Sequence, residues 1–133
     1  MRRFVVAAGL IALIAGALAA CGGSSSGGGS TLSMGGSSFT GATSITITAG
    51  QAVTFDDTSG GTHDLVTGTG GKFTAATGAP DEFSTADGLK LQVGDKKTVT
   101  FNNAGTYQIT CTIHPSMQAT IVVNAASGSG YGY

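Results

Sequence analysis

The feature that most limits the fold of this chain is an alternation of apolar and polar residues that turn sequences interrupt. In six stretches between residues 38 and 124, apolar side chains recur at every second position: 45–47, 53–55, 89–93, 99–101, 107–111 and 119–123. A period of two is typical of β-strands that bury one face. Glycine-rich or asparagine-rich turns follow at 56–62, 68–71 and 102–105. We therefore predict an all-β domain, a β-sandwich of about six to eight short strands.

The first 21 residues predict export. Arg2 and Arg3 precede an uncharged apolar run of 17 residues, Phe4 to Ala20, which is the layout of a secretion signal. The Leu-Ala-Ala-Cys sequence at 18–21 resembles the bacterial lipobox, in which the cysteine is lipidated and becomes the new N-terminus. The alternative is a plain membrane anchor, but the run is shorter than the roughly 20 residues that a span needs. We expect a lipoprotein signal peptide at 1–20 and a lipid on Cys21.

Glycine and serine dominate the segment that follows Cys21. The sequence GGSSSGGGSTLSMGGSS begins at residue 22, and we predict that residues 21–37 form a flexible tether. The C-terminal SGSGYGY is similarly low in complexity, so residues 125–133 are predicted to be a flexible tail. The folded domain is then 38–124. A lipid on residue 21 would hold it at the extracytoplasmic face of a bacterial membrane, in the periplasm or at the cell surface.

The charge of the exported part disfavours one class of partner. Without residues 1–20, four lysines oppose seven acidic residues, and four minus seven gives a formal charge of −3. A nucleic-acid-binding domain usually carries a basic face. We therefore expect no nucleic acid partner.

The segment YQITCTIHPSM, residues 107–117, concentrates possible metal ligands. Cys111, His114 and Met117 follow one another at intervals of three, and Pro115 stiffens the loop between them. If Cys21 is lipidated, Cys111 has no partner for a disulfide. A thiolate with a thioether favours copper(I), imidazole also suits copper(II), and two His, one Cys and a weak axial Met form a blue-copper site. The second histidine would be His63, the other histidine of the sequence.

Other interpretations explain these residues less well together. A lone cysteine is usually a small buried residue. A Cys-x-x-His pair also occurs in zinc sites, but structural zinc takes four strong ligands, and a thioether is a poor one. His63 and Asp64 are neighbours in a predicted strand, so their side chains point to opposite faces and do not form a catalytic pair. Four coordinating side chains leave no open position for a small-molecule substrate, so we predict that the protein is not an enzyme.

From about residue 44 to 123 the sequence resembles the cupredoxins, the type 1 blue copper proteins of the plastocyanin, amicyanin and auracyanin kind. The segment GTYQITCTIHPSM at 105–117 carries the resemblance, with the short Cys-x-x-His-x-x-Met spacing of amicyanins. The resemblance implies a Greek-key sandwich with one copper ion. By position, His63, Cys111 and His114 would be its equatorial ligands and Met117 its axial ligand. It also implies a monomer that carries electrons between redox proteins such as a cytochrome, a terminal oxidase or a dehydrogenase.

The same resemblance suggests how a partner would dock. The exposed edge of His114 would be the electron port. Ile113, Pro115 and Leu65 would form an apolar rim around it, suited to a small and weak interface.

Asp64 departs from the family pattern, which often has Asn after the first histidine ligand. The Asn braces the ligand loop. We expect the Asp64 carboxylate to turn outward or to bond to Thr112 or Ser116. A charged carboxylate that stayed near the thiolate would stabilise copper(II) and lower the reduction potential.

Two functions of other classes are left open. One is a lipoprotein that binds and delivers copper without passing electrons. The other is a copper-free sandwich that serves as an adhesion or assembly module. Intense colour with added copper(II), bleached reversibly by ascorbate, would favour the electron carrier over both.

Overall fold

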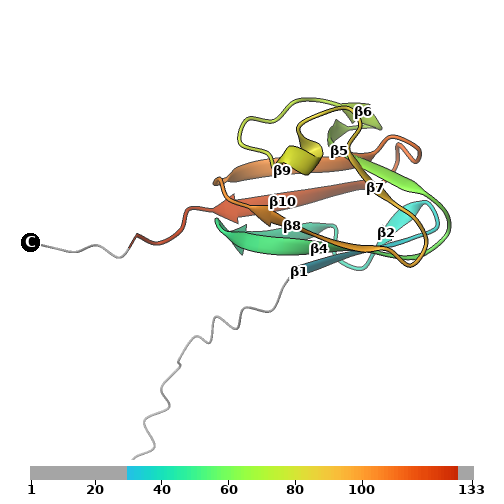
Figure 1. The fold of residues 1–133 in the computed structure, drawn as a ribbon, viewed down its shortest axis with the longest axis horizontal. Coiled ribbons are helices and arrows are strands. Elements are labelled where there is room, and N and C mark those ends of the chain that lie inside the picture. Colours follow the sequence, from blue (N-terminus) through green and yellow to red (C-terminus); the bar gives the residue numbers. More distant parts are fainter. Residues whose placement is uncertain (1–29, 129–133) are drawn as a thin grey trace, which may run out of the picture.

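The computed structural model describes residues 30–128, and they form two packed β-sheets (Figure 1). The first sheet has the order β2 (Ser38–Thr40), β1 (Ser30–Gly35), β4 (Gln51–Ser59) and β8 (Lys96–Phe101). The second has the order β3 (Ser44–Thr48), β10 (Gln118–Asn124), β9 (Gly105–Cys111), β5 (His63–Thr69) and β6 (Lys72–Phe73), and β7 (Leu89–Leu91) also pairs with β5. The described residues also include a 3-10 turn, η1 (Asp81–Phe83), and none of their helices is long and apolar enough to cross a membrane.

The chain passes repeatedly from one sheet to the other, as in a Greek-key sandwich. It crosses between β2 and β3, between β3 and β4, between β4 and β5, and on either side of β8. The predicted all-β sandwich is therefore confirmed. The described residues contain ten strands rather than six to eight, because short strands such as β2 and β6 carry too few residues to show a period.

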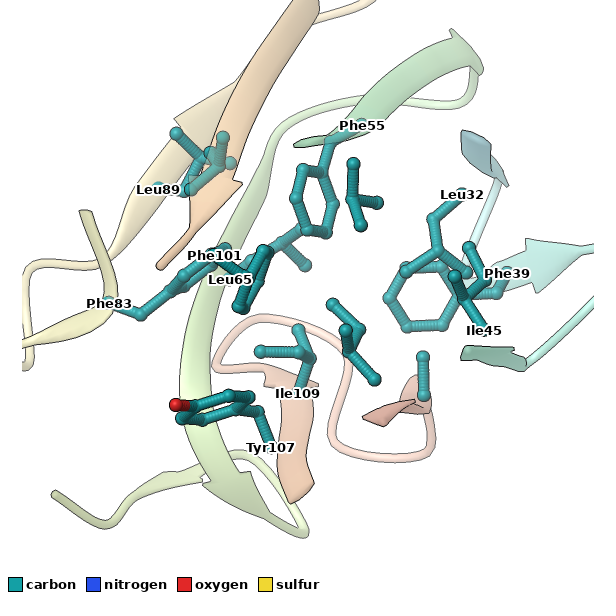
Figure 2. Close-up of a cluster of buried hydrophobic side chains, with 14 of the residues drawn as sticks. Leu32, Phe39, Ile45, Phe55, Leu65, Phe83, Leu89, Phe101, Tyr107 and Ile109 are labelled. Carbon is teal, nitrogen blue, oxygen red and sulfur yellow. The ribbon is translucent and has the colours of Figure 1, made fainter. Parts of the chain in front are cut away.

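Aromatic and aliphatic side chains fill the space between the two sheets (Figure 2). Phe83 on η1 lies between Phe55 and Phe101, with ring centroids 5.5 and 6.1 Å away. Phe101 in turn lies 5.4 Å from Tyr107, whose hydroxyl donates to the carbonyls of Gly78 and Asn103. Aromatic pairs at such distances contribute about 0.5–1.5 kcal/mol beyond the area that they bury. The Phe101–Tyr107 pair joins the first sheet to the second, and the two pairs of Phe83 attach η1 to the first sheet.

The folded domain begins earlier than we predicted. Residues 30–35 form β1, which runs parallel to β4 with Leu32 opposite Phe55, and Leu32 and Met34 are fully buried. The predicted tether at 21–37 is therefore wrong for residues 30–37, because the surrounding Gly and Ser concealed a short alternation of Leu and Met. The predicted signal peptide, Cys21 and the rest of the tether lie outside the described residues, as does the tail beyond residue 128.

Val93 is a second correction, because we expected it to continue the buried stripe of Leu89 and Leu91. It is 58% exposed. The strand ends at Leu91, and the chain turns where the Gln92 amide donates to Asp95 Oδ2 and the Asp95 amide donates to the Gln92 carbonyl. This turn, residues 92–95, takes Val93 out of the pleat.

The strand directions define two ends of the sandwich. β9 ends and β5 begins at what we call the Cys111 end, since Leu65 pairs with Cys111. β10 leads away from that end and finishes where Asn124 accepts a hydrogen bond from the Ala49 amide. The first described residue, Ser30, pairs with Val53 near the start of β4. The described chain thus enters and leaves the sandwich away from the Cys111 end.

Candidate metal centre

Strand pairing brings the two most distant predicted ligands together. Cys111 is the last residue of β9 and continues the buried series of Tyr107 and Ile109, so its thiol faces the core and is 0% exposed. β9 pairs with β5, and Leu65 lies opposite Cys111. His63 precedes Leu65 by two residues on the same face of β5 and is likewise 0% exposed.

A tight loop after Cys111 returns the other two predicted ligands to the same place. The Met117 amide donates to the His114 carbonyl at 2.9 Å, and the Cys111 amide donates to the Met117 carbonyl at 3.2 Å. These two bonds close the six residues after Cys111 into a compact turn. Met117 is 1% exposed and belongs to the core cluster, whereas His114 is half-buried.

The donor atoms converge on one point. Cys111 Sγ lies 3.9 Å from His63 Nδ1 and 3.7 Å from His114 Nδ1, and the three ligand atoms are within 4.8 Å of one another. The imidazole rings have centroids 5.1 Å apart and an interplanar angle of 53°. Metal bonds to nitrogen and sulfur are about 2.0–2.3 Å long, as at zinc, so these three atoms can share one ion.

Burial keeps His63 in the form that binds metal. Loss of hydration lowers the pKa of His63 below its ordinary value of 6.5, although the nearby Asp57 carboxylate acts in the opposite direction and His114 adds to the lowering. Only the neutral imidazole has a free lone pair for a metal. The environment of His63 thus favours a ligand over a cation.

Asp57 is a residue of the site that we did not predict. Its Oδ1 lies 3.7 Å from His63 Nε2, on the side of the ring that faces away from Cys111, and both side chains are 0% exposed. The sequence did carry a signal: Val53, Phe55 and Asp57 alternate, so an aspartate occupies a position of β4 that faces the core.

Asp64 and Thr112 meet as one of our alternatives predicted. Thr112 Oγ1 donates to Asp64 Oδ2 at 3.2 Å, and the Thr112 amide donates to the Asp64 carbonyl at 2.9 Å. The carboxylate therefore stays beside the ligand loop and bonds to Thr112 rather than to Ser116. Its other oxygen, Oδ1, is buried and has no hydrogen-bond partner within residues 30–128.

Two of the three side chains predicted to form an apolar rim are exposed. Ile113 is 51% exposed, and Pro115 is exposed beside the half-buried His114. Leu65 was wrongly assigned to the rim, because its pairing with Cys111 turns its side chain into the core, where it is 0% exposed. Figure 2 shows Leu65 among the buried side chains.

The chemistry of the donor set fits copper. Two imidazoles, one thiol and one thioether are the ligands of a blue-copper site, in which soft sulfur selects copper over harder cations. His63, Cys111, His114 and Met117 are positioned like the ligands of such a site. Copper held there would exchange single electrons between its +1 and +2 states.

Comparison with known proteins supports the same assignment. Residues 32–124 match the family described as copper binding proteins, plastocyanin/azurin family. Among solved structures, a reduced amicyanin variant has a TM-score of 0.54 and 23% identity, covering 73% of this chain and 83% of its own. The amicyanin of Paracoccus versutus has a TM-score of 0.52 and 21% identity, covering 73% and 82%. No curated protein matches the sequence.

Proposed function

This chain belongs to the plastocyanin/azurin family of copper-binding proteins, and we propose that it is an electron carrier rather than an enzyme. The observation that supports this function is the convergence of two imidazole nitrogens and a buried thiol within 4.8 Å, beside the equally buried Met117. Bound copper would supply the one-electron exchange.

The protein's own part is to change little when the electron arrives. His63 and Cys111 lie on paired strands, and two backbone hydrogen bonds hold the loop that carries His114 and Met117. A preorganised site avoids rearrangement at the moment of transfer, which favours speed. Four protein ligands also leave no position where a substrate would bind.

His114 is the proposed route for the electron. Its ring is half-buried, so one side faces the donor atoms while the other reaches the surface. Ile113 precedes His114 in the ligand loop, and its large apolar side chain is 51% exposed. We infer that the Cys111 end docks briefly on redox proteins such as a cytochrome, a terminal oxidase or a dehydrogenase, because weak redox encounters use small interfaces.

The proposed location is the extracytoplasmic face of a bacterial membrane, through a lipid on Cys21. The lipobox-like sequence supports it. The fold is compatible with it, because the described chain begins away from the Cys111 end. An anchor there would leave the metal centre facing away from the membrane, toward a soluble or membrane-bound partner.

The test is an optical and redox titration of residues 30–128 with copper(II). We expect one equivalent of copper to give an intense blue or green absorption that ascorbate bleaches and an oxidant restores. Cys111→Ser should bind copper without this colour, because the absorption needs the thiolate. Weak colour with rapid loss of copper to a chelator would instead indicate copper delivery, and no binding would refute a copper protein.

A further inference from the structure

Two buried polar groups behind the metal centre face each other. Neither carboxylate oxygen of Asp57 has a hydrogen-bond partner within residues 30–128, and the same is true of His63 Nε2. Asp57 Oδ1 and His63 Nε2 are 3.7 Å apart. Buried polar groups in folded proteins are almost always hydrogen-bonded, and buried charges are paired. The two groups are therefore best understood as partners of each other.

The backbone around Asp57 holds its side chain in this direction. The Asp57 amide donates to the Asp95 carbonyl at 2.9 Å, and the Asp57 carbonyl accepts from the Gly94 amide at 2.8 Å. The 92–95 turn thus fixes both backbone groups of Asp57. The same turn follows β7, in which Leu91 pairs with His63. β7 and the 92–95 turn that follows it therefore contact both Asp57 and His63 through the backbone.

The two nitrogens of the His63 ring face different groups. Nδ1 faces Cys111 Sγ at 3.9 Å, and Nε2 faces Asp57. A histidine that binds metal through one nitrogen must carry its proton on the other, and a carboxylate there fixes the tautomer and makes the ligand more basic. The 3.7 Å separation exceeds a hydrogen bond of about 2.7–3.2 Å, so a slight approach or one bridging water completes the contact.

Building on the copper carrier proposed above, we propose that Asp57 is the positioning residue of the metal centre. Its carboxylate accepts a hydrogen bond from the Nε2–H of His63, which leaves the Nδ1 lone pair directed at the ion. Its buried negative charge also favours copper(II) over copper(I), because the more highly charged ion gains more from a nearby anion in a medium of low dielectric constant. Asp57 thereby lowers the reduction potential.

The neighbouring aspartate provides a matched control. Asp56 precedes Asp57 on β4 and points to the opposite face, where its Oδ2 accepts from Lys96 Nζ at 2.6 Å. Asp57→Asn and Asp56→Asn remove the same charge from adjacent positions of one strand. We expect Asp57→Asn to reduce the preference for copper(II) about tenfold, which raises the potential by about 59 mV. Asp56→Asn should change it several-fold less. Equal shifts would overturn the proposal.

A measurement on the copper-free protein keeps the proposal testable if Asp57→Asn fails to fold. In apoprotein labelled with ¹⁵N-histidine, the coupling pattern of the ring nitrogens reports which one carries the proton. We expect the Nε2–H tautomer for His63 and a mixture for His114. A proton on Nδ1 of His63 would refute the role of Asp57. This readout needs no copper, so the proposal can fail here while the wild type still turns blue, and a colourless wild type would count against the proposed function instead.

Discussion

The two histidines of the metal centre occupy opposite surroundings. His63 lies on β5 between β7 and β9, is fully buried and has a carboxylate behind it. His114 lies in the loop between β9 and β10 and is half-buried. We call the half of the site with His63 the strand side and the half with His114 the loop side. The strand side fixes the position and charge of the site, whereas the loop side connects it to the surface. Under the proposed function, the half with His63 would hold the ion and the half with His114 would exchange the electron.

Removal of either histidine should change the copper absorption more than any other substitution considered below. His63→Gly and His114→Gly should both lose the intense copper absorption, because each removes a ligand. Added imidazole should restore the colour in His114→Gly, since the vacated space reaches the surface. In His63→Gly the space is enclosed by the core, so imidazole should enter poorly.

The measurement is the absorption of the copper-loaded variants during a titration with imidazole. Methylimidazoles of increasing size are the control for access. They should restore the colour of His114→Gly until they become larger than the space that the missing ring leaves. Equal rescue of the two variants would show that the strand side is as accessible as the loop side.

The loop side has its own support, in the turn between β5 and β6. Gly71 has φ +75°, its amide donates to Thr110 Oγ1 at 2.9 Å, and a Cβ added to it would lie 2.9 Å from Pro115 Cγ. Gly70 has φ +59°, but an added Cβ would meet no described atom within 4 Å. Both substitutions to Ala cost about 1–2 kcal/mol of backbone strain.

Gly71→Ala should lose more stability than Gly70→Ala, because it also pushes against Pro115 beside His114. Forced contacts of this kind cost about 1–3 kcal/mol. Urea unfolding of the two copper-free variants measures the difference, and the copper absorption band should shift in Gly71→Ala alone. Equal stabilities would mean that the loop yields easily and that the turn does not support it.

The sequence predicts the position of a residue in this fold well where the residue follows the alternation of a strand, and less well elsewhere. The period of two predicts the sandwich and the inward thiol of Cys111, and the residue types then predict the four ligands. The same rule was available for Asp57, but a charged residue at a core position is rare, so its alternation was not followed. Leu65 was misplaced because the period of two was not followed along β5, where Leu65 shares the inward face of His63 and pairs with Cys111.

A third prediction concerns contact on the loop side with another molecule. Ile113→Lys places a charge beside His114, and we expect electron self-exchange between two copies of the protein to slow about tenfold, which corresponds to about 1.4 kcal/mol. NMR line broadening in mixtures of the oxidised and reduced forms measures this rate. Val93→Lys is the control, because it adds the same charge to an exposed apolar position in the turn between β7 and β8 rather than in the loop that carries His114. A larger effect at Val93 would move the docking face toward that turn.

The stability of the copper-free protein should depend on pH through His63. Burial lowers the pKa of His63 below 6.5, so the unfolded state binds a proton more readily than the folded state. The free energy of unfolding is therefore highest, as far as His63 is concerned, above about pH 6.5. It falls as the pH drops toward the pKa of His63 in the folded protein, by at most about 1.4 kcal/mol per pH unit. Urea unfolding of the apoprotein between pH 7 and 5 should show this loss. His63→Gln should lack it, and identical pH profiles would refute the argument.

The smallest expected effect separates the two aspartates near the centre. Asp64 is only half-buried, and one of its oxygens accepts from Thr112, so water screens its charge more than that of Asp57. Asp64→Asn keeps an acceptor for the Thr112 hydroxyl and removes the charge alone. The preference for copper(II) should fall about threefold, a rise in potential of roughly 30 mV since tenfold is 59 mV. Spectroelectrochemistry of the Asp57→Asn and Asp64→Asn variants measures both potentials.

If the potential does not rise in Asp64→Asn, the Thr112 bond has already neutralised the influence of that carboxylate. A rise as large as in Asp57→Asn would mean that burial behind His63 gives Asp57 no special weight, and the asymmetry between the two halves of the site would then reside in access alone.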